Sequence, residues 1–234
     1  ARRQTLLFSA TYPAGIEELA GRFLRDPARI EVATQHDDQQ IEQRFYEVTP
    51  ETRLEALTRL LYSLRPTSCV AFCFTKQQCQ AVADHLAAKG VSAMALNGDL
   101  DQRDRDQVLG MFANRSLSVL VATDVAARGL DIASLDLVIN VELGRDAETH
   151  IHRIGRTGRA GEKGLAVSLV APKEMRRALT IEDQQNGAIQ WLPLDEVRPH
   201  VDRSPLQAPM TTLCIGAGRK QKLRPGDILG ALPG

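Results

Sequence analysis

The stretch that decides the fold class is Leu117-Ser118-Val119-Leu120-Val121-Ala122-Thr123-Asp124, an apolar run that ends in a hydroxyl and a carboxylate. Strands of a parallel sheet are covered on both faces and therefore read as continuous apolar runs, so this stretch predicts one. Asp124 is expected to cap the short helical turn that follows. Ligands of open α/β sheets bind at the carboxyl ends of the strands, and Thr123 and Asp124 fall at that end.

Strand-like and helix-like segments alternate along the rest of the chain. Such alternation predicts an α/β fold, a doubly wound parallel sheet with flanking helices and right-handed crossovers. The expected strands span residues 6–11, 41–48, 69–74, 92–96, 117–122, 135–141 and 165–170, and the expected helices span residues 13–24, 51–64, 77–89, 101–112, 147–154 and 173–184.

A second informative stretch is His152-Arg153-Ile154-Gly155-Arg156-Thr157-Gly158-Arg159, in which three arginines are spaced three apart and separated by glycines. Arginine presents a planar, permanently charged fork that matches phosphate oxygens two at a time. Glycine lets the backbone approach a ligand and turn sharply where a Cβ would clash. The stretch suits an arginine-finger device that stabilises charge on a transferring phosphoryl group, although alone it would also fit a solvated basic turn.

Two more of the expected strands end in residues that can hold a ligand. Thr75 follows strand 69–74, and Gly98 with Asp99 follows strand 92–96. Each of these residues could serve only as a helix cap. Their repetition in order along the chain favours a shared ligand-binding edge.

The order of these motifs resembles the C-terminal half of a DEAD-box RNA helicase of superfamily 2, over about residues 1–195. The chain departs from the family pattern at Asn97, where His is common, and at Gly144, where Pro is common. The matching motifs are Ser9-Ala10-Thr11 (motif III), Phe74-Thr75 (motif IV), Gln102 with Arg105 (the Gln-x-x-Arg element), residues 122–132 (motif V) and residues 152–159 (motif VI).

The resemblance implies a RecA-like domain that acts on ATP with Mg²⁺. Arg156 and Arg159 would be the catalytic arginine fingers, and they would bind the nucleotide together with Gly129 and Asp131. Arg153 would support them, although a salt bridge that orients the loop is an equally open role for it.

The resemblance also implies contacts to RNA and to the other domain of the same protein. The RNA contacts would be to phosphates, without base readout, and would come from Thr75, Gly98, Gln102, Arg105 and Thr123. Coupling between the domains would fall to Ser9, Thr11, His152 and Arg153, and helix capping is the alternative role for Ser9 and Thr11.

Two family signatures are missing from the sequence, which contains neither a Gly-x-x-x-x-Gly-Lys-Ser/Thr phosphate loop nor an Asp-Glu-Ala-Asp run. In the family both lie ahead of motif III, in the first RecA-like domain, where the Mg²⁺ ligands are also expected. We therefore expect a fragment that is inactive alone. Its expected parts are the end of the first RecA-like domain (1–33), an interdomain linker (34–40), the second RecA-like domain (41–195), a linker (196–209) and the truncated start of an RNA-recognition-like domain (210–234).

The last of these parts reads as a strand over 210–215, a basic segment and a helix that starts near residue 224. It resembles the opening of the RNA-recognition-type domain that ends one bacterial branch of the family. A basic tail with a stray apolar stretch is the alternative. The first interpretation implies structured ribosomal RNA as the partner and large-subunit assembly as the process.

The composition is that of an ordinary globular protein, with 25% charged and 43% hydrophobic residues. Lys+Arg and Asp+Glu balance at 29 each, so RNA binding must come from local basic patches. The 4% aromatic content argues against a module that threads bases over aromatic rings.

The four cysteines show no metal-ligand spacing and are expected to be reduced structural thiols, which indicates a cytoplasmic protein. No apolar run approaches the length of a membrane span, so no membrane partner is expected. The predicted function is ATP-driven local unwinding of RNA. A non-catalytic RNA- or nucleotide-binding module, for the isolated chain, and half of a superfamily 2 DNA helicase are the alternatives.

Overall fold

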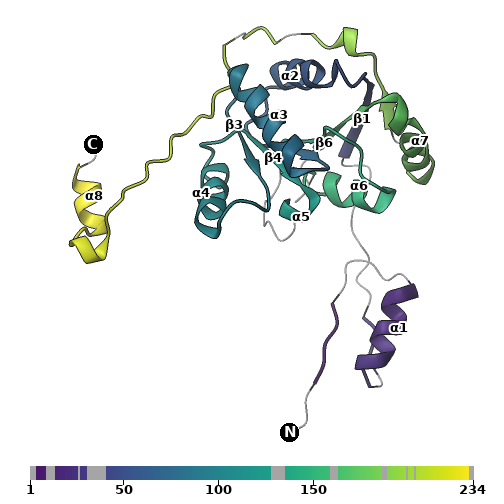
Figure 1. The fold of residues 1–234 in the computed structure, drawn as a ribbon, viewed down its shortest axis with the longest axis horizontal. Helices are drawn as coiled ribbons and strands as arrows, with labels where there is room; N and C mark the ends of the chain where they lie inside the picture. Colours follow the sequence, from purple (N-terminus) through teal and green to yellow (C-terminus); the bar gives the residue numbers. More distant parts are fainter. Residues whose placement is uncertain are drawn as a thin grey trace. The chain divides into compact units, whose positions relative to one another are not determined.

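The computed structural model describes residues 4–8, 14–25, 27–30, 41–127, 135–158, 163–185, 189–198, 200–202 and 204–231. The chain divides into two compact units, residues 1–36 and residues 37–234. The first unit contains helix α1 (Ala14–Phe23). The second contains a sheet and the remaining helices (Figure 1). The domain boundaries expected above stay a prediction.

The second unit is built on a seven-stranded parallel sheet in the order β3-β4-β2-β5-β6-β1-β7. Its non-consecutive neighbours are joined by helical crossovers, as in a doubly wound fold, so the predicted fold class is confirmed. The strands are β1 (Ile41–Glu47), β2 (Cys69–Cys73), β3 (Ala93–Leu96), β4 (Val119–Thr123), β5 (Leu137–Asn140), β6 (Gly164–Val170) and β7 (Ile189–Trp191).

Helices cover both faces of this sheet (Figure 1). Alternate residues of β2 show the two layers, because Ala71 packs in the core cluster of α2 and α3 while Phe72 packs in the cluster of α4 and α5. The helices of this unit are α2 (Arg53–Leu64), α3 (Lys76–Ala88), α4 (Gln102–Ala113), α5 (Asp124–Ala127), α6 (Ala147–Ile154), α7 (Met175–Gln184) and α8 (Pro225–Ala231). Short 3₁₀ turns span Pro172–Glu174, Leu194–Glu196 and Arg219–Gln221.

Three of these helices begin at a side chain that accepts a backbone hydrogen bond from the first turn. Thr75 caps α3, Asp101 caps α4 and Asp146 caps α6. The bond from the Thr149 amide stabilises the ionised form of Asp146 and lowers its pKa. Because each cap follows or precedes a strand closely, it fixes where the helix leaves the edge of the sheet.

One expected strand, residues 210–215, is absent, the described part of a second is not a strand, and one unexpected strand is present. Residues 6–8 and residues 210–215 form no strand, because no described strand lies beside either segment to share backbone hydrogen bonds. Residues 9–11 of the first prediction lie outside the described residues. Strand β7 went unpredicted because only three residues pair with β1 at the sheet edge, too few to show an alternating pattern.

Within the second unit, part of the chain after β7 packs back on the α2–α3 layer. Leu206 is buried in the α2–α3 cluster, and its carbonyl accepts a bond of 2.9 Å from the Ser92 amide. The guanidinium of Arg65 donates to the carbonyl oxygens of Asp202 and Ser204 at 3.2 and 2.9 Å. Further along, the Met210 amide donates to the Arg115 carbonyl. We call residues 202–212 the C-terminal strap.

Candidate nucleic-acid interface

The structure brings the five residues predicted to face RNA to one edge of the sheet. Strands β3, β4 and β2 are neighbours, and parallel strands present their carboxyl ends at the same edge. The ion pair between Lys76 and Asp99, 2.8 Å long, ties the turn after β2 to the turn after β3. The five residues are Thr75, Gly98, Gln102, Arg105 and Thr123.

Thr75 is exposed and is held by Gln78 at the start of α3. Its hydroxyl accepts from the Gln78 backbone amide, while its own N–H and O–H both donate to Gln78 Oε1 at 3.1 and 2.9 Å. This reciprocal arrangement is a capping box, so the capping role weighed for such residues is real for Thr75. A phosphate oxygen could replace Gln78 Oε1 as the acceptor of the hydroxyl proton without loss of the cap.

Gln102 and Arg105 lie on the first turn of α4. Gln102 is exposed and donates to Asp106 at 2.7 Å. Arg105 is half-buried, and its Nη2 donates to the Ala126 carbonyl of α5 at 2.7 Å, which joins α4 to the helix that follows β4. Nothing lies within 4 Å of the position that a Cβ would take at Gly98, so the backbone there is open to a ligand.

Arg153 lies inside the molecule and is not a surface residue. It is 2% exposed, and its guanidinium forms a fork with both carboxylate oxygens of Asp124 at 2.6 and 2.9 Å. The guanidinium carbon also lies 5.0 Å from the centre of the Phe72 ring. The structure thus shows the salt bridge named above for Arg153, and its supporting role beside the arginine fingers stays a prediction.

The expectation that Asp124 caps the turn after β4 is wrong. The Thr123 hydroxyl accepts from the Ala126 amide at 3.3 Å and occupies the capping position instead. Asp124 is the first residue of α5, and its carboxylate is engaged by Arg153 because a buried guanidinium needs a charged partner.

Arg156 is half-buried in the turn after α6, and its carbonyl accepts from the Leu135 amide at 3.1 Å. Two glycines near this turn are required, one by its backbone conformation and one by a close contact. Gly158 has a φ of 66°, and a Cβ at Gly164 would lie 2.7 Å from the Gly158 Cα. His152 is exposed on the last turn of α6. The other predicted site residues, Ser9, Thr11, Gly129, Asp131 and Arg159, lie outside the described residues.

A buried polar chain behind this edge was not predicted. His150 is 0% exposed, with its Nε2 3.0 Å from Gln43 Oε1 and its Nδ1 3.5 Å from Asn140 Nδ2. Burial, reinforced by the positive charge of Arg153, lowers the pKa of His150 to about 4. His150 is therefore neutral at physiological pH, and Asn140 also accepts a bond from Arg153 Nη1 at 3.0 Å.

Two buried carboxylates lie beside this chain. Glu142 accepts from the Phe74 amide at 3.1 Å and from Gln78 Nε2 at 2.9 Å. Glu174 accepts from the backbone of Ala171 and Leu143, and Arg53 pairs with both carboxylates. Glu142 could have been suspected, because it ends an apolar strand as Asp124 does. Arg53 and Glu174 carry no such signal, since charged residues near helix starts are common.

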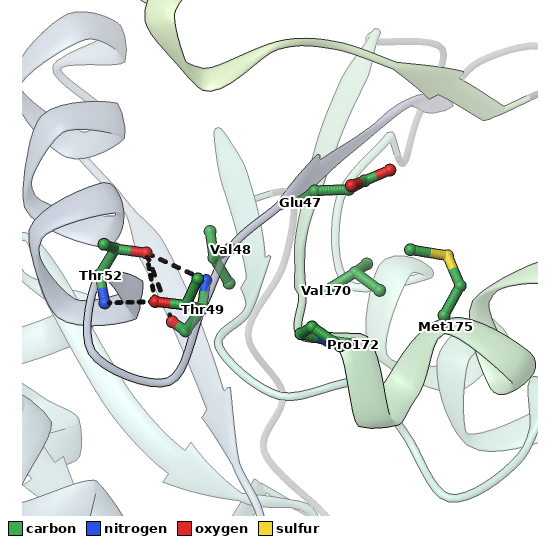
Figure 2. Close-up of a pocket in the computed structure, with 7 residues that line it drawn as sticks. All are labelled: Glu47, Val48, Thr49, Thr52, Val170, Pro172 and Met175. Atoms are coloured by element: carbon green, nitrogen blue, oxygen red, sulfur yellow. Dashed lines mark hydrogen bonds between the residues drawn. The ribbon is translucent and has the colours of Figure 1, made fainter.

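A separate cavity of about 430 Å³ opens where β1 and β6 end (Figure 2). Figure 2 shows Thr49 and Thr52 hydrogen-bonded to each other on one side and Met175 on the other. Among the described residues, Glu47 is the only charged one that lines the cavity, so this part of the chain offers it none of the cations that a triphosphate needs. The predicted site residues that the structure describes do not line it. The lining residues are Glu47, Val48, Thr49, Thr52, Val170, Pro172 and Met175.

The cysteines of the described chain are free, and three of them, Cys69, Cys73 and Cys79, are buried. Burial raises the pKa of the Cys69 thiol, which keeps it protonated and unreactive. Among the described residues, no group of three or more His, Cys, Asp and Glu side chains is arranged to hold a metal ion. Nor do these residues include a helix long and apolar enough to span a bilayer.

Comparison with known proteins identifies relatives of the whole chain. Residues 52–161 match the model of the helicase conserved C-terminal domain. The chain is 54% identical over 236 residues to the ATP-dependent RNA helicase DbpA of Escherichia coli (strain K12), a match that covers 100% of this chain and 50% of that protein. The chain thus spans about half the length, or less, of the curated relatives it matches. The bacterial branch mentioned above, whose final RNA-recognition-type domain residues 210–234 resemble, is that of the DbpA-like proteins.

Solved structures give the same result for the fold. One similar structure is that of the E. coli DEAD-box protein SrmB bound to the regulator of ribonuclease activity A. It matches this chain with a TM-score of 0.64 and 33% identity, over 70% of this chain and 97% of that chain. S. cerevisiae Dbp5 bound to RNA and ADP BeF3 has a TM-score of 0.72 and 30% identity over 81% of this chain and 51% of that chain.

Proposed function

This chain belongs to the DEAD-box helicase family and carries its C-terminal helicase domain, and on that premise we propose that it is the second RecA-like half of an ATP-dependent RNA helicase. The whole protein would couple ATP hydrolysis to local opening of RNA duplexes. Residues 1–33 would belong to the end of the first RecA-like domain, which would supply the phosphate loop and the Mg²⁺ ligands.

The observation that carries the proposal is the shared edge of the sheet. The turn after β2 presents the Thr75 hydroxyl, the segment after β3 presents the open backbone of Gly98 and the guanidinium of Arg105, and β4 ends in the Thr123 hydroxyl. All of these groups bind phosphate without reading bases. Helix α6, which follows β5, is tied to the same edge by the Arg153–Asp124 fork. An RNA strand and the phosphates of a nucleotide would therefore contact neighbouring strand ends.

The proposed roles follow the chemistry of each group. Arg156 and Arg159 would meet the charge that develops on the transferring phosphoryl group, because the guanidinium fork matches two phosphate oxygens at once. Gly129 and Asp131 would complete the nucleotide contacts, and an ionised carboxylate can only accept hydrogen bonds, as from a ribose hydroxyl. Ser9, Thr11 and His152 would couple the two domains.

The RNA partner and the location are the finer part of the proposal. The resemblance of residues 210–234 to the RNA-recognition-type domain of the DbpA-like branch favours structured ribosomal RNA and large-subunit assembly. A cytoplasmic location fits the three buried free thiols, since reduced cysteines are usual in a reducing compartment.

The test is steady-state ATP hydrolysis by the full-length protein, with and without RNA. We expect RNA to stimulate turnover and Arg156→Lys to lower the turnover rate on the order of 10³-fold, because lysine keeps the charge but loses the planar fork. Binding of a non-hydrolysable ATP analogue should change far less. The exposed Arg145, in the loop before α6, provides the control variant Arg145→Lys, which should behave as wild type.

Other results would identify the alternatives. RNA binding without ATP turnover in the full-length protein would indicate a non-catalytic module, and stimulation by DNA in place of RNA would indicate a DNA helicase. RNA-stimulated turnover by residues 1–234 alone would contradict the assignment of the phosphate loop to a separate domain.

A further inference from the structure

Glu142 lies directly behind the RNA-facing edge, and its position is unusual for a carboxylate. It follows β5, is 6% exposed, and both of its carboxylate oxygens are engaged. We propose that Glu142 is a positioning residue that fixes the RNA-binding turn at Thr75 by orienting the Gln78 side chain. The inference rests on the proposed function, because it assigns Glu142 a part in RNA binding at that same edge.

The contacts form a relay with a defined direction. Glu142 Oε2 accepts from the Phe74 amide at 3.1 Å, and Glu142 Oε1 accepts from Gln78 Nε2 at 2.9 Å. Because the Gln78 NH₂ group faces the carboxylate, its carbonyl Oε1 faces Thr75 and accepts the N–H and O–H of that residue. Glu142 therefore decides which end of the Gln78 amide meets Thr75.

The orientation of Gln78 is important when RNA arrives. In the structure the Thr75 hydroxyl donates to Gln78 Oε1, so a phosphate oxygen must replace that acceptor. With Gln78 held by Glu142, the Thr75 amide keeps its bond to Oε1 and the helix start stays in place. The reverse orientation of Gln78 would direct an NH₂ group at the Thr75 amide, where two donors would oppose each other.

The surroundings of Glu142 place a positive charge beside its carboxylate and tie the residue to α6. Arg53 Nη1 lies 3.6 Å from Glu142 Oε1 and supplies the opposite charge. The backbone carbonyl of Glu142 accepts from Arg153 Nη1 at 2.7 Å. The same residue thus contacts the RNA-facing turn through its side chain and the Arg153–Asp124 fork through its backbone.

The test uses three variants of the full-length protein at positions 142 and 78. Glu142→Gln replaces one acceptor oxygen by an NH₂ group, so the side chain at position 142 can no longer accept from both Phe74 and Gln78. We expect the RNA concentration that gives half-maximal ATPase stimulation to rise about tenfold, the scale of one or two lost hydrogen bonds. The ATPase rate at saturating RNA should change much less, because the backbone bond to Arg153 remains.

The double variant Glu142→Gln with Gln78→Glu restores the donors and acceptors of the contacts with Phe74, position 78 and Thr75 with the two groups exchanged, and only the ion pair of Arg53 with Glu142 is lost. The new amide at position 142 would donate to the new carboxylate at position 78, whose other oxygen would still accept from Thr75. We therefore expect the RNA dependence to return toward wild type. Gln78→Glu alone places two carboxylates face to face and should be worse than wild type. Glu148→Gln makes the same chemical change at an exposed position of α6 and should match wild type.

The outcomes separate this inference from the function on which it rests. An unchanged RNA dependence in Glu142→Gln, or a double variant no better than Glu142→Gln, overturns the positioning role. A loss of thermal stability that the double variant repairs without repairing the RNA dependence also overturns it, since Glu142 would then act only in folding. Wild-type protein that RNA does not stimulate overturns the proposed function, and this inference with it.

Discussion

At the scale of the residue, Arg105 has two functions to reconcile. Its Nη2 donates a hydrogen bond to the Ala126 carbonyl. The resemblance also assigns Arg105 a contact to an RNA phosphate. A guanidinium has five donors, so one bond to a carbonyl leaves others for a phosphate. Arg105→Ala should therefore weaken RNA binding about equally across unrelated sequences and reduce the slope of binding against salt by about one ion.

Binding of several single strands at two salt concentrations measures this effect. Arg176→Ala removes the same charge from an exposed position on α7 and is the matched control. A loss confined to one RNA sequence would mean that Arg105 reads bases. An unchanged slope of RNA binding against salt would mean that Arg105 contacts no phosphate and makes only the structural bond to Ala126.

Which residues line the strand ends could be predicted from the sequence, because polar residues that follow apolar runs mark the carboxyl edge. What each residue contacts could not be predicted. Asp124 looks like a cap from its position, yet its partner Arg153 lies 29 residues away and only the packing of α6 brings them together. Glu142 and Gln78, 64 residues apart, show the same limit.

At the scale of the element, the buried His150 links α6 to both β1 and β5. The pKa of His150 is lowered from 6.5 to about 4, so the folded protein resists its protonation. Above pH 6.5 both the folded and the unfolded states are neutral at this position. Between pH 6.5 and 4 only the unfolded state binds the proton. The free energy of unfolding should therefore fall by about 1.4 kcal/mol for each unit by which the pH is lowered.

Urea unfolding across this pH range tests the prediction. His150→Gln removes the titrating group. In this variant the pH dependence of the free energy of unfolding should therefore lose the contribution of about one proton. His152→Gln, at an exposed position of the same helix, should keep the wild-type slope. Equal slopes in wild type and His150→Gln would show that His150 titrates normally in the folded state.

Elements with strong periodicity or a cap were predicted almost to the residue, and α6 matched its expected range of 147–154. Strands were predicted where the run is apolar on both faces, as in β2 and β4. The failures share one cause, since a strand requires a neighbour. Residues 210–215 have the composition of a strand but no described strand beside them, whereas β7 has three ordinary residues and a partner in β1.

At the scale of the whole molecule, the sequence predicted the doubly wound sheet but gave no sign that the C-terminal strap packs on it. Isolated apolar residues among prolines are typical of a linker, and only the structure shows that Leu206 reaches the α2–α3 core. Arg65, at the end of α2, has a φ of 45°, and its guanidinium donates to the strap carbonyls. Arg65 thus anchors the start of the strap, although no sequence pattern marks it for that role.

The burial of Leu206 makes the strap a contributor to stability. Leu206 is 4% exposed, so Leu206→Ala should lower the free energy of unfolding by about 2 kcal/mol or more, through lost burial and the cavity that remains. The strap should also loosen, and the amides of Ser92 and Met210, which bond across its edges, should exchange with solvent faster. Denaturant unfolding and amide hydrogen exchange measure the two effects.

The matched control is Leu213, which is 75% exposed. Leu213→Ala makes the same truncation without losing burial, so its stability should stay within about 0.5 kcal/mol of wild type. Equal stability of the two variants would show that Leu206 contributes no net burial energy. Faster exchange at Met210 without a loss of stability would show that the strap opens independently of the core, because an amide that exchanges by local opening reports that opening and not global unfolding.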